Sequence, residues 1–279
     1  MLNELFVACL GAVFLAYLIW GFHVLPAEGW QFLAALPRRP AANGEWEGLN
    51  LTWYGLFSSV AQIVSVVTVF LLFGAVGITR GVTVLLTITV LGVCVPGSKW
   101  VARLVEGKSA TFSVSGAAFL GILVLPWAIL LANAVAVAGP GQPIPPVPAL
   151  AAVAIAYGFG EGLGRLACIS FGCCYGKPLR ESHPLLRWLF RRWHFVFRGE
   201  TKKIAYAGGL AGEQVVPIQA VTALLYTAAG LLDLWLFLRG HYGTALALFL
   251  AVTQLWRVFS ETLRADWRGT GTFSLYQVF

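Results

Sequence analysis

The chain has 279 residues, of which 58% are hydrophobic and only 11% charged, and it contains 11 tryptophans. This composition excludes a soluble domain and indicates an integral membrane protein. The formal charge of +7 lies mostly on residues that flank apolar runs, so no nucleic-acid partner is expected.

Seven apolar runs are each close to the roughly 20 residues that a helix needs to cross a bilayer. They cover about 4–25, 51–75, 82–98, 113–138, 147–172, 215–238 and 243–263. The predicted fold class is all-α: a polytopic membrane protein of about seven transmembrane helices, with residues 1–279 forming one membrane domain. Asn3 and Glu4 stand where a signal peptide would carry basic residues. The first run is therefore expected to remain as an extra N-terminal helix.

The basic residues are distributed unevenly between the two sides of these helices. Fifteen Lys and Arg residues fall in loops 26–49, 99–112 and 177–214 and in the tail, against Arg80 and Arg239 on the other side. The positive-inside rule therefore predicts that these loops are cytoplasmic and that the N-terminus lies outside.

Two of the loops have compositions typical of a membrane surface. Residues 26–49 mix Pro, Trp and Arg, which predicts an interfacial loop. The long basic and aromatic loop 177–214 alternates arginines with aromatic rings over 185–198. It suits an anionic bilayer either as a topology anchor or as a surface that binds substrate headgroups.

The stretch 157–177 is the strongest candidate for chemistry. Glu161 and Arg165 lie four residues apart, on one face of the expected helix, and an ionisable group in hydrocarbon requires a partner or a polar cavity. Glycines are dense here, at positions 158, 160, 162, 164, 172 and 176. They allow close approach of a helix, of bent backbone or of a lipid headgroup, and a plain packing face is the alternative interpretation.

The five cysteines do not form a paired extracellular framework. Cys168, Cys173 and Cys174 follow the apolar part of this stretch, but their spacing matches no zinc motif. The sequence therefore gives no reason to expect a metal ion or any other cofactor.

The sixth and seventh runs carry further charges. Asp233, near the far end of the sixth run, is expected to reach solvent. Arg257, Glu261 and Arg264 are spaced to share one face of the seventh helix. They form either a structural salt-bridge stripe or part of a polar site, and such a cluster is unfavourable in a bilayer without polar partners.

Four stretches, in this order, resemble the bacterial phosphatidylglycerol–prolipoprotein diacylglyceryl transferase family over residues 50–279. They are Trp53-Tyr54-Gly55-Leu56; Gly164-Arg165-Leu166 with Gly172, Tyr175 and Gly176; Pro217-Ile218-Gln219; and Arg257 to Asp266, which includes Glu261 and Arg264. Order and intervals make the match specific, although each piece alone is weak.

The resemblance implies a seven-helix enzyme of the bacterial plasma (inner) membrane. Such an enzyme moves the diacylglyceryl group of phosphatidylglycerol onto a prolipoprotein cysteine and releases glycerol phosphate. Carried over position by position, the resemblance assigns six residues to the functional cleft: Tyr54, Arg165, Gly176, Gln219, Arg257 and Glu261.

Several family positions are replaced in this chain. A functional histidine in the fourth helix aligns with Ser115, and a functional asparagine after Gly-Arg aligns with Cys168. A glutamate aligns with Cys173, and a tyrosine before the seventh-helix arginine aligns with Thr253. The family's general-base set is therefore absent.

The remaining positions favour phospholipid chemistry. Arg165 and Arg257 in a low-dielectric cleft are expected to converge on a phosphodiester and stabilise a leaving phosphate. Cys173 or Cys168 would supply a thiolate whose pKa a neighbouring arginine lowers, or would only fill space in a tight turn. The predicted catalytic residues are Arg165, Cys173, Arg257 and Glu261, and the predicted substrate-binding residues are Tyr54, Cys168, Gly176, Gln219 and Arg264.

The expected partners are an anionic phospholipid, the bilayer and an acceptor that the sequence does not name, either a prolipoprotein or another molecule. Two other function classes stay open. One is a non-catalytic lipid-binding or scaffold protein, and the other is a small-solute transporter lined by the charged residues, although no inverted repeat is visible.

Overall fold

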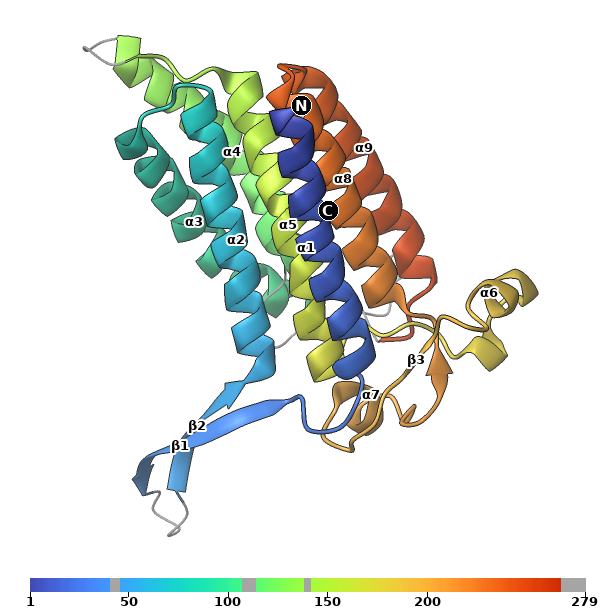
Figure 1. Cartoon of the computed structure of the whole chain (residues 1–279). Coiled ribbons are helices and arrows are strands. Elements are labelled where there is room, and N and C mark those ends of the chain that lie inside the picture. Colours follow the sequence, from blue (N-terminus) through green and yellow to red (C-terminus); the bar gives the residue numbers. More distant parts are fainter. Residues whose placement is uncertain (41–45, 107–113, 138–141, 267–279) are drawn as a thin grey trace. The chain divides into compact units, whose positions relative to one another are not determined.

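The computed structural model describes residues 1–40, 46–106, 114–137 and 142–266. Long helices account for most of them (Figure 1) and follow the apolar runs of the sequence. Their bounds are α1 Leu2–Val24, α2 Trp53–Ala75, α3 Arg80–Glu106, α4 Val114–Val137, α5 Pro146–Phe171, α8 Ile218–Leu238 and α9 Tyr242–Thr262. Among the described residues, six helices are long and apolar enough to cross a membrane, and Phe119–Val135 within α4 is a shorter apolar helix. The predicted all-α polytopic fold is confirmed.

Shorter elements lie between these helices. They are β1 Phe32–Pro40, β2 Trp46–Thr52, η1 Leu179–Glu181, α6 Pro184–Leu189, β3 Phe195–Val196, α7 Lys203–Tyr206 and β4 Gln214–Val215. The structure divides into two compact units. Unit 1 comprises residues 1–64, 158–231 and 262–266, and unit 2 takes in residues 65–157 and 232–261.

In unit 1, the extra N-terminal helix α1 packs directly on α5. The rings of Phe14 and Phe159 meet edge to face with centroids 5.1 Å apart. A Cβ on Gly21 would come within 2.5 Å of the Leu166 side chain, so a larger residue there would require Leu166 to shift. Leu166 is fully buried, and α1 therefore covers an apolar face of α5 that would otherwise be exposed.

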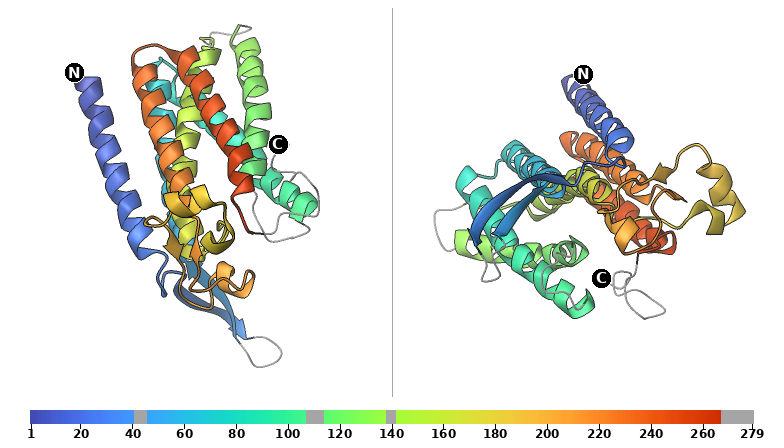
Figure 2. Two further views of the ribbon diagram at one scale, coloured as in Figure 1. Left: turned by 90° about the vertical axis from the view of Figure 1, so that its right-hand side faces the viewer. Right: turned by 90° about the horizontal axis from the view of Figure 1, so that it is seen from below.

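The segment 26–49 was predicted to be a loop, but its described residues include strand β1 and most of strand β2, which form an antiparallel pair in unit 1, as Figure 2 shows beyond the end of α1. Strand β1 pairs with β2 from Phe32 opposite Thr52 to Pro40 opposite Trp46. Pro37 and Pro40 argued for a loop, but both strands of a two-stranded hairpin are edges, where proline is tolerated. Every residue of β1 is exposed, which leaves the apolar side chains of this strand uncovered within unit 1.

A buried lysine ties the segment after α5 to the helices of unit 1. Lys202 is only 1% exposed, and its Nζ donates to the carbonyl oxygens of Leu25 at 3.0 Å and Ser170 at 2.8 Å. Burial lowers the pKa of Lys202 to about 8, because the charged form loses hydration. Lys202 thus joins the ends of α1 and α5.

In unit 2, α3 and α4 pack along each other. Helix α3 continues to Glu106 although Pro96 lies inside it, eight residues beyond the end that the apolar run suggested. Asp233 on α8 was expected to reach solvent, but it is fully buried. Both of its carboxylate oxygens lack a hydrogen-bond partner among the described residues. The prediction for Asp233 is wrong because neighbouring side chains cover this residue completely.

Candidate functional site

Arg165 and Glu161 form an ion pair on α5 within unit 1, as their spacing predicted. Arg165 Nη2 donates to Glu161 Oε1, and the two side chains are 18% and 9% exposed. Arg165 Nε is buried without a hydrogen-bond partner among the described residues. The carboxylate therefore holds one edge of the guanidinium and leaves another N–H for a further acceptor.

The chain turns sharply where α5 ends. Gly172 has φ +69° and Cys174 has φ +58°, the latter being the one described non-glycine residue with positive φ. A non-glycine residue in this region is uncommon and indicates a conformation held by its surroundings. The Cys173 N–H donates to the Cys168 carbonyl at 3.0 Å, so the turn folds back against the last turn of the helix.

This turn gathers three thiols into one cluster, which we call the thiol cluster: Cys168, Cys173 and Cys174. Their sulfur atoms all lie within 4.8 Å of one another. None of the three cysteines is in a disulfide in the described part of the chain, and all three are partly buried. The sequence spacing gave no indication of this grouping, because residues 168 and 173 do not share a face of a regular helix.

The environment of Cys173 differs from the one predicted. The neighbouring Cys168 and Cys174 thiols, and after them burial, raise the pKa of Cys173 well above its ordinary value. The net shift at Cys173 is therefore opposite in direction to the lowered pKa expected there. Without a further positive charge, Cys173 is a protonated thiol at neutral pH.

Tyr54 and Arg165 lie beside the thiol cluster. Tyr54, at the start of α2, stacks edge to face on Phe171 with ring centroids 5.7 Å apart. It lies within electrostatic range of all three thiols and of Arg165, and Arg165 lies within range of Cys168 and Cys174. These predicted site residues are thus brought together in unit 1.

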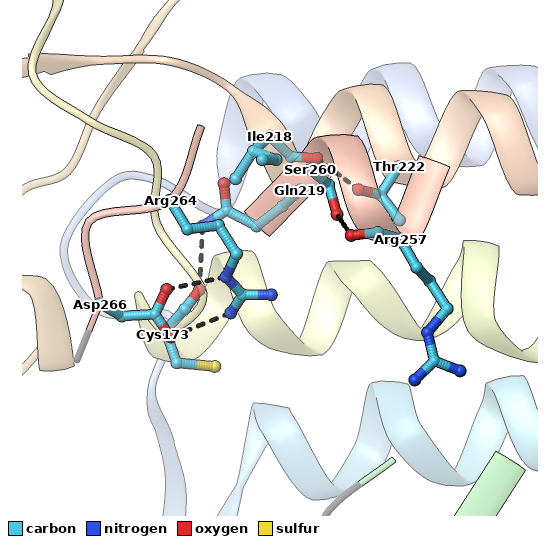
Figure 3. A network of polar contacts seen from close by, with 8 residues as sticks. All are labelled: Cys173, Ile218, Gln219, Thr222, Arg257, Ser260, Arg264 and Asp266. Carbon is cyan, nitrogen blue, oxygen red and sulfur yellow. Dashed lines mark hydrogen bonds and ion pairs between the residues drawn. The ribbon is translucent and has the colours of Figure 1, made fainter. Parts of the chain in front are cut away.

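Gln219 joins the same turn from the first turn of α8. Its Nε2 donates to the Cys173 carbonyl at 2.9 Å (Figure 3), and the residue is 1% exposed. Its Oε1 is buried without a partner among the described residues. The amide therefore fixes the cysteine turn and keeps a free acceptor for a donor such as a hydroxyl.

Arg264 does not share the helical face predicted for it, because α9 ends at Thr262. It lies in an extended segment that pairs with Gly176. Its guanidinium donates to both carboxylate oxygens of Asp266, at 2.8 and 2.9 Å (Figure 3). A Cβ on Gly176 would lie 2.4 Å from the Val216 carbonyl oxygen. Gly176 thus permits close packing against the backbone of Val216. The ion pair between Arg264 and Asp266 holds the segment that pairs with Gly176.

Arg257 and Glu261 belong to unit 2 and lie one helical turn apart on α9. Arg257 Nη2 is buried without a partner among the described residues. The Ser260 hydroxyl donates to the Arg257 carbonyl at 3.1 Å, which is a contact of the backbone and not of the guanidinium. Because Arg165 belongs to unit 1, the convergence of the two arginines on a phosphate stays a prediction.

Two residues near the site were missed by the sequence-based interpretation. Lys202 was counted only as a loop charge, and Cys174 was considered only within a cysteine spacing that matches no zinc motif. Neither carries a motif, since a lysine in a basic loop is usually solvated. The paired glycines around Cys173 and Cys174 were the one available signal of a turn.

Comparison with known proteins agrees with the architecture. The sequence matches the family described as prolipoprotein diacylglyceryl transferase over residues 44–279. No curated protein matches the chain.

Proposed function

The chain belongs to the prolipoprotein diacylglyceryl transferase family, and we propose that it moves a diacylglyceryl group from an anionic phospholipid to a thiol acceptor. The proposed donor is phosphatidylglycerol, and the proposed acceptor is the cysteine of a prolipoprotein. The proposed location is the plasma membrane of a bacterium, with the helices crossing the bilayer.

The observation that carries this proposal is that the buried guanidinium of Arg165 has only part of its hydrogen-bonding capacity satisfied. Glu161 orients its guanidinium, while the buried Nε has no partner among the described residues. A cation that is fixed in a low-dielectric site and still has a free donor is suited to a phosphate oxygen. In the transfer reaction the acceptor thiolate attacks the glyceryl carbon next to the phosphate. The negative charge that grows on the departing phosphate would be stabilised by Arg165.

The other site residues have supporting roles in this proposal. Tyr54 and Gln219 would hold the glycerol hydroxyls or ester groups, because each lies beside the thiol cluster and offers a polar atom. Arg257 and Glu261 are proposed to supply a second cation and a carboxylate. Arg264 acts through the backbone segment that it anchors, as a positioning residue.

The segment after α5 offers a surface suited to anionic lipid. Trp188 and Trp193 are 72% and 76% exposed, and Arg187, Arg191 and Arg192 beside them are exposed as well. Aromatic rings interleaved with arginines favour the headgroup region of an anionic bilayer. This surface would keep the donor lipid near the site.

The proposal is tested by transfer in phosphatidylglycerol vesicles containing the purified protein and a prolipoprotein-derived peptide with one cysteine. Mass spectrometry should show the diacylglyceryl thioether and released glycerol phosphate. Arg165→Ala should lower kcat/KM by about 2–5 kcal/mol of transition-state stabilisation. Arg80→Ala is the matched control, since Arg80 is exposed at the start of α3, and it should retain wild-type turnover.

The same vesicles separate the other function classes. A scaffold protein would bind phosphatidylglycerol without releasing glycerol phosphate. A transporter would move a trapped solute without forming the thioether. Either result, or full activity of Arg165→Ala, would contradict the proposed transfer.

A further inference from the structure

The thiol cluster has the geometry of a metal site that the sequence spacing did not reveal. Two ligands bound at about 2.3 Å to one tetrahedral zinc ion lie about 3.8 Å apart. The three sulfur atoms lie within 4.8 Å of one another. Rotations that draw them together by at most about 1 Å would therefore place all three on a single zinc ion.

The backbone around the cluster is held in place independently of the thiols. The Cys173 N–H donates to the Cys168 carbonyl, and Gln219 Nε2 donates to the Cys173 carbonyl. Cys174 keeps a positive φ in this turn, a strain that is typical of functional sites. Such a fixed arrangement is what a metal site requires of the backbone that presents its ligands.

We propose that Cys168, Cys173 and Cys174 bind one zinc ion whose fourth coordination position receives the acceptor thiol. This inference rests on the proposed function for the identity of the acceptor. Three sulfur ligands select a soft, tetrahedral ion, and three protein ligands leave a fourth position for water or substrate. None of the three cysteines is fully buried, as the approach of an incoming sulfur requires.

The ion supplies what the replaced general-base residues cannot. A thiol coordinated to zinc loses its proton outright, so the acceptor becomes a thiolate without a base in the protein. The proton goes to solvent. The acceptor sulfur then forms a bond to the glyceryl carbon, and that carbon's bond to the phosphate-ester oxygen breaks. The electron pair leaves with glycerol phosphate, so no oxidant or reductant is needed.

Arg165 lies where this chemistry requires a second positive charge. It precedes Cys168 by one helical turn on the same face of α5 and is within electrostatic range of Cys168 and Cys174. The metal would hold the nucleophile and the guanidinium would hold the leaving phosphate. The two charges therefore act on opposite ends of the reacting centre.

The first test measures metal without reference to activity. Protein purified in detergent from zinc-supplemented cells should contain about one zinc per chain. Cys168→Ser, Cys173→Ser and Cys174→Ser should each lower zinc affinity at least about tenfold. Cys9→Ser, on α1, is the matched control and should keep the ion. Cobalt substitution should give a thiolate-to-cobalt band that changes when a cysteine peptide is added, but not when its serine analogue is added.

The second test links the ion to transfer. A chelator should abolish thioether formation by the wild-type protein while phosphatidylglycerol binding persists, and added zinc should restore transfer. This experiment does not depend on whether the serine variants fold. Transfer by protein that is free of metal and insensitive to chelator would overturn the zinc site and leave the proposed function standing. One bound zinc without transfer to any thiol would instead refute the proposed function and the acceptor role.

Two further outcomes would also overturn the inference. A disulfide between two of the three cysteines, detected by thiol counting of the denatured protein, would remove the ligands. Loss of transfer in Cys173→Ser alone, with Cys168→Ser and Cys174→Ser active, would favour a covalent cysteine nucleophile over a metal ligand set.

Discussion

The close packing of α5 against α8 can be measured with one pair of glycine substitutions. A Cβ on Gly162 would lie 2.5 Å from Thr227 Oγ1 and 3.1 Å from the Ala223 carbonyl oxygen on α8. A Cβ on Gly164, two residues further along the same helix, would lie 3.7 Å from the Ala61 Cβ, which is an ordinary contact. Gly162→Ala and Gly164→Ala thus make the same chemical change in two different environments.

The expected magnitudes follow from these distances. Both substitutions gain about 1 kcal/mol of helix propensity, so this contribution cancels when the two variants are compared. Gly162→Ala must in addition displace a backbone carbonyl that cannot rotate away, and overpacking of this kind costs about 1–3 kcal/mol. Gly164→Ala should therefore be more stable than wild type, and Gly162→Ala less stable than Gly164→Ala by that difference.

Thermal unfolding in detergent, followed by tryptophan fluorescence, is a suitable assay. A difference of this size should separate the two midpoints by on the order of 5 °C. Equal midpoints for the two variants would refute the reasoning, because they would mean that α8 does not approach α5 at Gly162 as described.

Three further predictions concern unit 1. Because burial lowers the pKa of Lys202 to about 8, the folded state binds fewer protons than the unfolded state between about pH 8 and the ordinary lysine pKa near 10.4. Stability should therefore rise across that window in the wild-type protein and show no such rise in Lys202→Met, as measured by unfolding midpoints at each pH. Replacing both Trp188 and Trp193 by serine should weaken binding of the solubilised protein to phosphatidylglycerol vesicles, whereas neutral vesicles should show little change. In a variant that lacks the five native cysteines, Glu200→Cys, at an exposed position, should resist an impermeant maleimide in intact cells if the basic loop is cytoplasmic, and labelling there would reject the orientation given by the charge bias.

The long helices were predictable because each needs only a continuous apolar run of bilayer length. The Glu161–Arg165 pair was predictable for a similar reason, since helical periodicity alone brings the two side chains together. Both inferences depend on local geometry. The hairpin was not predicted, because its prolines suit a loop as well as an edge strand.

The thiol cluster could not be predicted from spacing, because it depends on where α5 ends. Had the helix continued past Phe171, Cys173 and Cys174 would lie around its circumference, away from Cys168. The positive φ values at Gly172 and Cys174 bring them back. Arg264 is the converse case: helical spacing aligned it with Arg257, but α9 ends before it.

The packing of α1 has a consequence for what counts as a foldable unit. The family match begins at residue 44, yet residues before it contribute to the packing of unit 1. The Leu25 carbonyl accepts a hydrogen bond from the Lys202 ammonium, and the Phe14 ring covers Phe159. A fragment cut at the start of the match would expose the apolar face of α5 and leave Lys202 without the Leu25 carbonyl. The N-terminal helix is therefore a fixed part of the scaffold, and homologous segments exchanged into this chain would have to fit against it.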